Sequence, residues 1–244
     1  IGYMKKLGLI IFSYSLVYGH DPNNDIASVW TAYSRLNFVQ GADQQSGAGI
    51  YARLKRVKGN QFNDIRLFGN ALENDQYLYL RHKSSQIFST YPDWYRFTTV
   101  SYEKNTLANV SLRYHYNNGI GYFLNKSNTG NMTFELGLAF DMSDYFNDTW
   151  KTSYIKSAFT WDVTISKFES KIELDYFSQI SDIVQSDLTR VQILGEIKYP
   201  ITPGLSFILS FSQELSKNIE FDSEAKTLSY SIGWQKPISG KFLK

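Results

Sequence analysis

The sequence contains no cysteine, so it offers no disulfide framework, no thiolate metal site and no cysteine nucleophile. Proline and methionine are also scarce, with five and three residues among 244. After the N-terminal twenty residues, no apolar run approaches the roughly 18–20 residues that a membrane-spanning helix needs. These absences exclude several enzyme classes and a helical membrane protein.

Aromatic residues, in contrast, are abundant. The chain holds 18 Tyr and 17 Phe, while its mean hydropathy is negative. Aromatic and branched side chains pack well on the pleated surface of a β-sheet. Since a single barrel domain commonly holds about 200–250 residues, length and composition together predict one all-β domain.

The first residues have the three parts of a secretory signal peptide. The basic pair Lys5 and Lys6 precedes an apolar stretch from Leu7 to Val17, and Gly19 supplies the small residue before a cleavage point. The three residues ahead of Met4 are interpreted as an upstream extension, and a buried first strand is the alternative interpretation. We predict four parts: a signal peptide with this short extension at 1–19, a periplasmic segment at 20–26, a barrel at 27–236 and a tail at 237–244.

The net charge of the chain indicates which partners to expect. Removal of residues 1–19 takes away Lys5 and Lys6 and no acidic residue, which leaves 23 basic and 23 acidic residues. The mature chain is therefore formally neutral. It lacks the basic stripe that nucleic-acid binding requires, so nucleic acid is not an expected partner.

The strongest structural signal is an alternation of apolar and polar residues, which is typical of a strand between lipid and a polar interior. Within 132–142 the even positions are all apolar, whereas the odd positions include Glu135 and Asp141. Seven such strands follow residue 110, with a bend expected at Asn117–Gly119. Weaker patterns predict five earlier strands, near 27–39, 46–57, 62–73, 76–88 and 93–104.

These strands predict a transmembrane antiparallel up-and-down β-barrel of about twelve strands in the bacterial outer membrane, since bacterial barrels have an even strand number. A soluble sandwich or a lipocalin would show the same alternation. Strands of ten or more residues and aromatics near the strand ends favour the membrane barrel. The lipid bilayer and the barrel-assembly machinery are then expected partners.

A central stretch carries a family resemblance. An aromatic strand ends at Tyr102 and Glu103, and a Tyr-rich strand follows with the segment Gly119, Gly121 and Tyr122 around Ile120. This arrangement resembles the YdiY-like family of salt-induced outer-membrane proteins, a domain of unknown function. The resemblance implies an outer-membrane location and a stress-related role, and it implies no chemistry.

The polar parity of the later strands predicts a lumen lined by charges of both signs, because charges this numerous cannot face lipid. Two interpretations stay open: a channel for small polar solutes, or ion pairs that fill a narrow lumen. The predicted lumen-lining residues are Arg113, His115, Glu135, Asp141, Lys156, Asp162, Lys171, Glu173, Asp175, Arg190, Glu196, Lys198 and Glu214.

Two weaker motifs are candidate sites. His82 and Ser84 share one strand face and are the candidate base and nucleophile of a lipid hydrolase, which is the alternative function. Asp141, Asp144 and Asp148 are a candidate Ca²⁺ set that lacks the glycine of a calcium loop. We expect no enzyme activity, no cofactor and no metal. Membrane-interface anchoring is predicted for Trp94, Tyr95, Tyr114, Tyr116, Tyr122, Trp150, Trp161, Tyr199 and Trp234.

Overall fold

The computed structural model describes residues 28–41, 45–108, 110–145, 148–181, 187–217 and 225–238. The predicted signal peptide at 1–19, the segment at 20–26 and residues 239–244 of the predicted tail lie outside these ranges. Within them, no helix is long and apolar enough to cross a membrane. The elements are β1 (Val29–Gly41), β2 (Ser46–Lys58), β3 (Gln61–Leu72), β4 (Gln76–Ile87), β5 (Trp94–Asn105), the short 3-10 helix η1 (Thr106–Ala108), β6 (Val110–Ser127), β7 (Gly130–Tyr145), β8 (Asp148–Ile165), β9 (Phe168–Gln179), β10 (Arg190–Thr202), β11 (Leu205–Ser216) and β12 (Ala225–Ile238).

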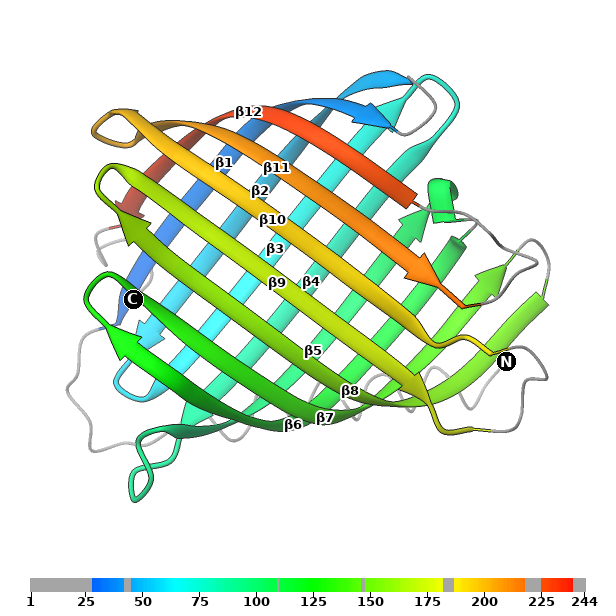
Figure 1. Ribbon diagram of the computed structural model, residues 1–244, viewed down its shortest axis with the longest axis horizontal. Coiled ribbons are helices and arrows are strands. Elements are labelled where there is room, and N and C mark those ends of the chain that lie inside the picture. The colour runs from blue at the N-terminus through cyan, green and yellow to red at the C-terminus, as the bar shows by residue number, and fades with distance from the viewer. Residues whose placement is uncertain are drawn as a thin grey trace.

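The strands form a closed antiparallel barrel (Figure 1). Each strand pairs with the next one along the chain, and β12 pairs with β1 from Trp30 opposite Ile238 to Gly41 opposite Thr227. The predicted twelve-strand barrel is therefore confirmed. The predicted bend at Asn117–Gly119 is wrong, because these residues continue β6 and pair with both β5 and β7.

The strands are long enough to cross a bilayer. The shortest hold twelve residues, which extend about 40 Å and therefore span about 28 Å when tilted by about 45°. Tight turns at 59–60, 166–167 and 203–204 mark one end of the barrel, the turn end, where β1 also begins. Gly59 and Gly204 supply the positive φ values of 53° and 84° at two of these turns. The opposite end, the loop end, carries the longer connections 180–189 and 217–224.

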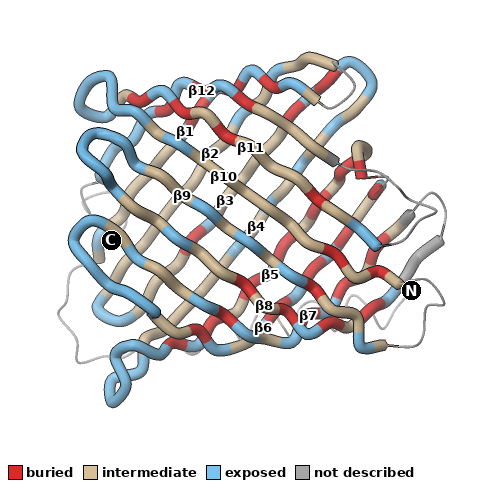
Figure 2. Tube along the Cα trace, viewed as in Figure 1, coloured by how far each residue is buried: buried red, intermediate tan, exposed pale blue. Residues whose placement is uncertain are grey.

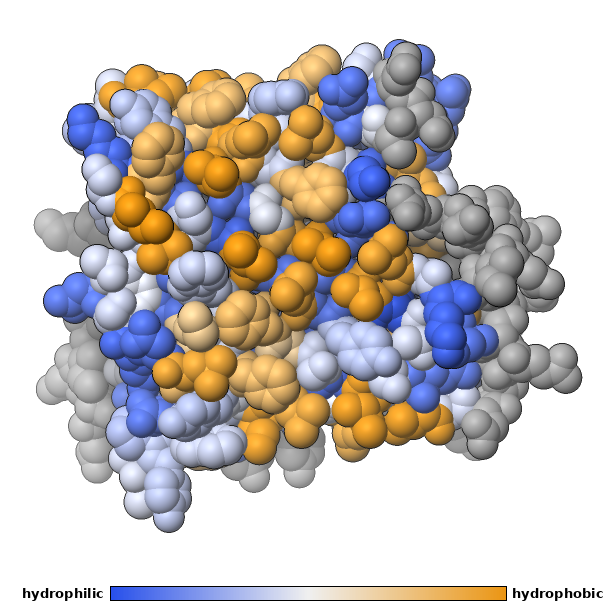
Figure 3. Space-filling view, in the orientation of Figure 1, coloured by the Kyte–Doolittle hydropathy of each residue, from blue (hydrophilic) through white to orange (hydrophobic). Residues whose placement is uncertain are grey.

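The outer face of the barrel is apolar. Alternate residues of each strand turn outward, and Figure 2 shows exposed and buried residues alternating along the strands. Large hydrophobic side chains cover much of the outer face in view in Figure 3. The exposed set includes Leu36, Phe38, Ile50, Ile65, Leu78, Leu80, Ile120, Leu136, Leu138, Ile155, Ile172, Ile197 and Ile232. In water such a surface would be unfavourable, so it is a lipid-facing surface.

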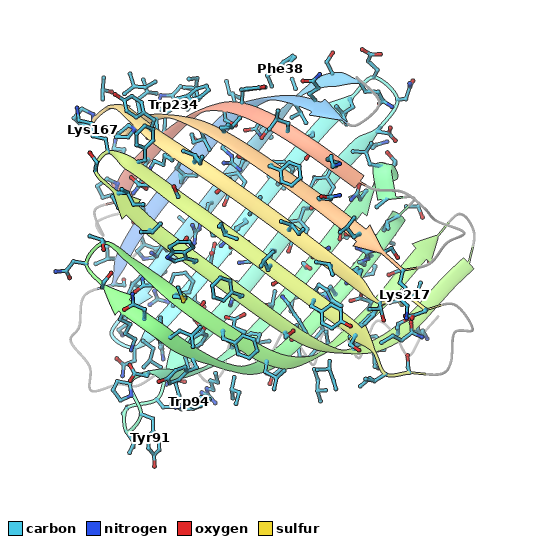
Figure 4. The ribbon with its side chains drawn as sticks, viewed as in Figure 1. Phe38, Tyr91, Trp94, Lys167, Lys217 and Trp234 are labelled. Carbon is cyan, nitrogen blue, oxygen red and sulfur yellow. The ribbon has the colours of Figure 1, made fainter. Side chains whose placement is uncertain are left out.

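Exposed aromatic side chains lie toward both ends of this apolar face. Trp94 and Trp234 lie toward the turn end, as Figure 4 shows, and Tyr114 lies near the start of β6 at the loop end. Near the turn end the rings of Trp94 and Tyr122 lie 4.8 Å apart, centroid to centroid. The exposed rings among the predicted anchors are Trp94, Tyr114, Tyr116, Trp161, Tyr199 and Trp234. Tyr95 is a correction, because it points inward and is only 6% exposed. The side chain of Trp150 lies outside the described part of the structure.

Two glycines allow β6 and β7 to approach closely. Gly119 lies opposite Gly137, and a Cβ atom on Gly119 would sit 2.2 Å from the carbonyl oxygen of Leu136. On Gly195 an added Cβ atom would have no heavy atom within 4 Å. Backbone proximity thus explains the glycine at position 119 of β6.

We expect Gly119→Ala to lower the free energy of unfolding by about 1–3 kcal/mol, because the new methyl group must push the two strands apart. Gly195→Ala is the matched control and should change it by less than about 0.5 kcal/mol. Urea unfolding in lipid vesicles, followed by tryptophan fluorescence, measures both. Equal effects at the two positions would contradict the close approach.

Candidate functional site

The candidate functional site is the lumen of the barrel. All thirteen predicted lumen residues occupy the parity opposite to the exposed apolar face, and their side chains are buried or half-buried. Many of them contact strands that are not their neighbours in the sheet, which requires that they project into the interior. They do not form one cluster but lie in several groups along the barrel.

The first group lies near the loop end and is centred on Arg113 of β6, which is 2% exposed. Its Nη1 atom donates to Oε2 of Glu103 at 3.0 Å, and its Nη2 atom donates to Oε1 of Glu214 at 3.2 Å. Gln192 Nε2 also donates to Glu214, at 2.7 Å. Because β6 and β11 are five strands apart in the ring, Arg113 connects two distant walls.

A second group, also toward the loop end, is centred on Asp141 of β7. His115 Nδ1 lies 2.5 Å from one carboxylate oxygen, and Arg190 Nη2 lies 2.7 Å from the other. The Arg190 guanidinium carbon lies 4.1 Å from the ring centroid of Phe177 and 4.9 Å from that of Tyr154. A buried cation is thus held between a carboxylate and two aromatic rings, which compensates part of its desolvation cost.

Further along the lumen, Asp64 of β3 is fully buried and lies among three arginines. Arg53 donates to both of its oxygens, at 3.1 and 2.7 Å, and Arg66 donates to one of them at 3.0 and 3.1 Å. Arg81 Nη2 approaches to 3.9 Å. Sequence reasoning missed this group, because the inward faces of β2–β4 also carry aromatic residues that obscure the polar parity.

One contact spans the full width of the barrel. Arg66 Nη1 of β3 lies 3.5 Å from Oε1 of Glu173 on β9, and these strands are six positions apart in a ring of twelve. Glu173 also pairs with Lys171 on its own strand. We call the Arg66–Glu173 contact the central bridge.

Other charged pairs cross part of the lumen or line one wall. Arg35 of β1 contacts Glu196 of β10 at 2.5 Å, and Lys83 of β4 pairs with Glu135 of β7. Tyr95 donates to the same Glu135 at 2.8 Å. The pairs between neighbouring strands are Lys156–Asp175 at 2.7 Å and Lys198–Glu169 at 3.0 Å, and Asp162 lies opposite Lys171 in the register.

The charges are segregated between opposite walls. The described inward faces of β1–β4 carry one acid, Asp64, and six bases: Arg35, Arg53, Lys55, Arg66, Arg81 and Lys83. The described inward faces of β7–β10 carry four bases (Lys156, Lys171, Arg190 and Lys198) and seven acids (Glu135, Asp141, Asp162, Glu169, Glu173, Asp175 and Glu196). A solute in the lumen would therefore experience a field directed across the barrel.

One exposed ion pair lies outside the spanning strands, at the loop end. Lys217 Nζ contacts the Asp187 carboxylate at 2.7 Å, and Figure 4 shows Lys217 at the end of β11. The hydrogen bond from Lys217, with a further one from Thr189, lowers the pKa of the Asp187 carboxyl to about 2. The pair links the β9–β10 connection to the end of β11, and its exposure to solvent makes it weak.

The residues of the predicted hydrolase and calcium motifs are placed as follows along the strands. His82 and Ser84 occupy the outward parity of β4, and His82 lies opposite Ile65 and Val100, both exposed on the lipid-facing surface. Asp141 points into the lumen while Asp144 has the opposite parity, and the Asp148 side chain lies outside the described residues. In the described part of the chain, no group of three or more His, Cys, Asp or Glu residues could hold a metal ion.

Comparison with known proteins places this fold. No curated protein matches the sequence. The structure of the NanC porin in a rhombohedral crystal form superposes with a TM-score of 0.57 over 85% of this chain and 100% of the porin, at 10% identity. The KdgM porin, solved in complex with disordered oligogalacturonate, gives a TM-score of 0.47 at 10% identity over 87% and 100% of the two chains. An outer-membrane channel from Pseudomonas putida F1 gives 0.45 at 8% identity over 90% and 100%.

The likeness to the NanC porin shows a shared fold, and that fold, with its lipid-facing apolar surface, is the one that bacterial outer-membrane channels use. The barrel is accordingly an outer-membrane barrel that resembles small porins. A family model described as "Protein of unknown function, DUF481" matches residues 84–234, which is more than half of the sequence. The chain therefore belongs to the DUF481 family.

Proposed function

We propose that this barrel is a narrow outer-membrane channel for small polar or charged solutes, with a lumen closed by ion pairs between opposite walls. The observation that carries the proposal is the central bridge, in which Arg66 and Glu173 meet from diametrically opposed strands. A lumen that two side chains can bridge is too narrow for large solutes. It is also lined by the charges that polar solutes require.

The central bridge is suited to open and close. The side chains of Arg66 and Glu173 are 11% and 21% exposed, so water reaches both partners. At 3.5 Å the contact is longer than a good hydrogen bond, and a partly buried ion pair of such geometry contributes little net free energy, because desolvation offsets the Coulomb attraction. A solute or a thermal fluctuation can therefore separate the two side chains without disturbing the buried groups near the loop end.

The proposal is tested by ion conductance in planar lipid bilayers. The wild-type barrel should give small single-channel steps, and Glu173→Ala should give steps several-fold larger, because the wall opposite Arg66 then lacks its carboxylate. The matched control is Asp175→Ala, two residues along β9, where the carboxylate pairs with Lys156 on the neighbouring strand. Its conductance should stay near the wild-type value.

The channel proposal is overturned if neither the wild type nor Glu173→Ala gives single-channel steps. That result would instead favour a second function, a stress-related envelope barrel with a permanently filled lumen. The buried Arg113, Glu103 and Glu214 group supports this second candidate, because three charges held this tightly obstruct passage near the loop end. The resemblance to salt-induced outer-membrane proteins belongs with it.

We further propose that the protein is not an enzyme and does not bind nucleic acid. The lipid-facing position of His82 and Ser84 supports the first statement, since a base and nucleophile also need a carboxylate and an oxyanion hole beside them. Purified barrel in lipid vesicles should release no acyl chain, and Ser84→Ala should change nothing. Insertion by the barrel-assembly machinery is proposed from the fold class.

A further inference from the structure

The wall formed by β2, β3 and β4 repeats one arrangement three times. Each strand places an aromatic residue and an arginine two positions apart on its inward face. The aromatic residues are directly paired in the sheet and form the ring row Tyr51, Phe68 and Tyr79. The arginines are likewise paired and form the arginine row Arg53, Arg66 and Arg81.

The ring row is part of a continuous aromatic surface. The ring centroids of Tyr51 and Phe68 lie 6.3 Å apart, and Tyr33 and Tyr77 extend the contacts at 5.6 and 5.2 Å. The rings are half-buried, so part of each one faces the lumen. A ring-shaped solute could therefore lie against this wall in contact with more than one aromatic side chain.

The arginine row has more donors than its own wall can satisfy. Asp64 is the one acid on the inward faces of β2–β4, and Arg53 and Arg66 take its hydrogen bonds. Arg81 is 3.9 Å from Asp64, beyond hydrogen-bonding distance, and its Nε atom has no partner among the described residues. Lys55 and Lys83 flank Asp64 in the next paired row and add two further positive charges.

A carboxylate already approaches this row from across the lumen. Glu173 lies 3.5 Å from Arg66, a separation longer than a good hydrogen bond. It therefore occupies the place that a solute carboxylate would take at Nη1 of Arg66, whose Nε and Nη2 atoms donate to Asp64. A solute anion that binds Arg66 would displace Glu173 and so separate the central bridge.

We propose that the ring row and the arginine row together form a binding site for small organic anions that carry a ring next to a carboxylate. The arginines hold the carboxylate while the adjacent aromatic side chains contact the ring. The role of this site in passage rests on the channel function proposed above, because it names the solute class that the channel would carry. Binding itself can be measured without conductance.

The test is isothermal titration calorimetry of the detergent-solubilised barrel. Benzoate and glucuronate are the ring-bearing anions, with an aromatic and a saccharide ring respectively, and acetate is the anion without a ring. We expect at least one of the first two to bind about fivefold or more tightly than acetate, which is the ratio that one ring contact supplies. Benzyl alcohol, which has a ring and no charge, should bind more weakly than benzoate.

Variants of Phe68 test whether anions bind at the ring row and the arginine row. Phe68→Leu should reduce the ratio of the affinity for the ring-bearing anion to the affinity for acetate toward one. Phe68→Tyr should retain the wild-type ratio. The matched control is Phe134→Leu, since Phe134 lies on the outward face of β7 and should not affect binding. Equal affinity for all three anions, or a preference that survives Phe68→Leu, would overturn the site. Absence of conductance steps would overturn the channel and leave the binding result standing.

Discussion

Replacement of Arg113 by alanine should lower the free energy of unfolding by about 3–5 kcal/mol, because it breaks a buried network of ion pairs. The side chain is 2% exposed and pairs with Glu103 at 3.0 Å and with Glu214 at 3.2 Å. Without it, two carboxylates stay buried near each other with one less cation. Urea unfolding in lipid vesicles, followed by tryptophan fluorescence, measures the loss.

Two comparisons make that prediction specific. Lys198→Ala removes a cation whose partner Glu169 is half exposed, and it should cost less than about 1 kcal/mol. The triple variant Arg113→Met, Glu103→Gln and Glu214→Gln removes all three charges together and should recover most of the stability lost in Arg113→Ala. If Arg113→Ala costs no more than Lys198→Ala, the cluster near the loop end is not the buried network described above.

Leu136→Arg should destabilise the barrel in a bilayer by about 2–4 kcal/mol, because it places a charge on the lipid-facing side of the middle of β7. Leu136 is exposed and lies opposite Ile120, which is exposed as well. The side chain would have no lumenal acid within reach on that face. Reversible urea unfolding in phospholipid vesicles is again the measurement.

The depth of the substitution provides the control. Ile165 is the last residue of β8 at the turn end and is 63% exposed, so Ile165→Arg should cost only about 0–1 kcal/mol at the membrane interface. Equal costs at Leu136 and Ile165 would mean that the outer face does not meet hydrocarbon in the way its alternation indicates. A larger cost at the strand end would contradict the lipid-facing assignment directly.

The later strands could be predicted from sequence because their two faces differ in chemistry. Between Met132 and Met142 of β7 the outward residues are all apolar and the inward ones include Glu135 and Asp141, so parity alone assigns the faces. The early strands lack this contrast. Tyr51, Phe68 and Tyr79 point inward, so both faces of β2–β4 carry apolar surface and the period of two is weakened. The arginine row went unrecognised for that reason.

Two predictions from the sequence were wrong because tertiary contacts decided the outcome. Asn117–Gly119 has the composition of a bend, yet Gly119 continues β6 because Gly137 opposite allows the two backbones to approach. Tyr95 has the composition of an interface anchor, yet it points inward, where Gly121 leaves space for its ring and Glu135 accepts a hydrogen bond from its hydroxyl group. Neither outcome follows from a residue's own preference, because each depends on a partner strand.

The sequence by itself determined the class of this protein, the number of strands and the mixed charge of the interior, because alternation along a strand is a local property that each segment carries alone. Only the tertiary structure decided which charges meet. Arg66 and Glu173 are 107 positions apart in the chain, and their contact depends on ring closure and on the register of every strand between them. Whether the lumen is bridged or open follows from that closure, and so does the function proposed for it.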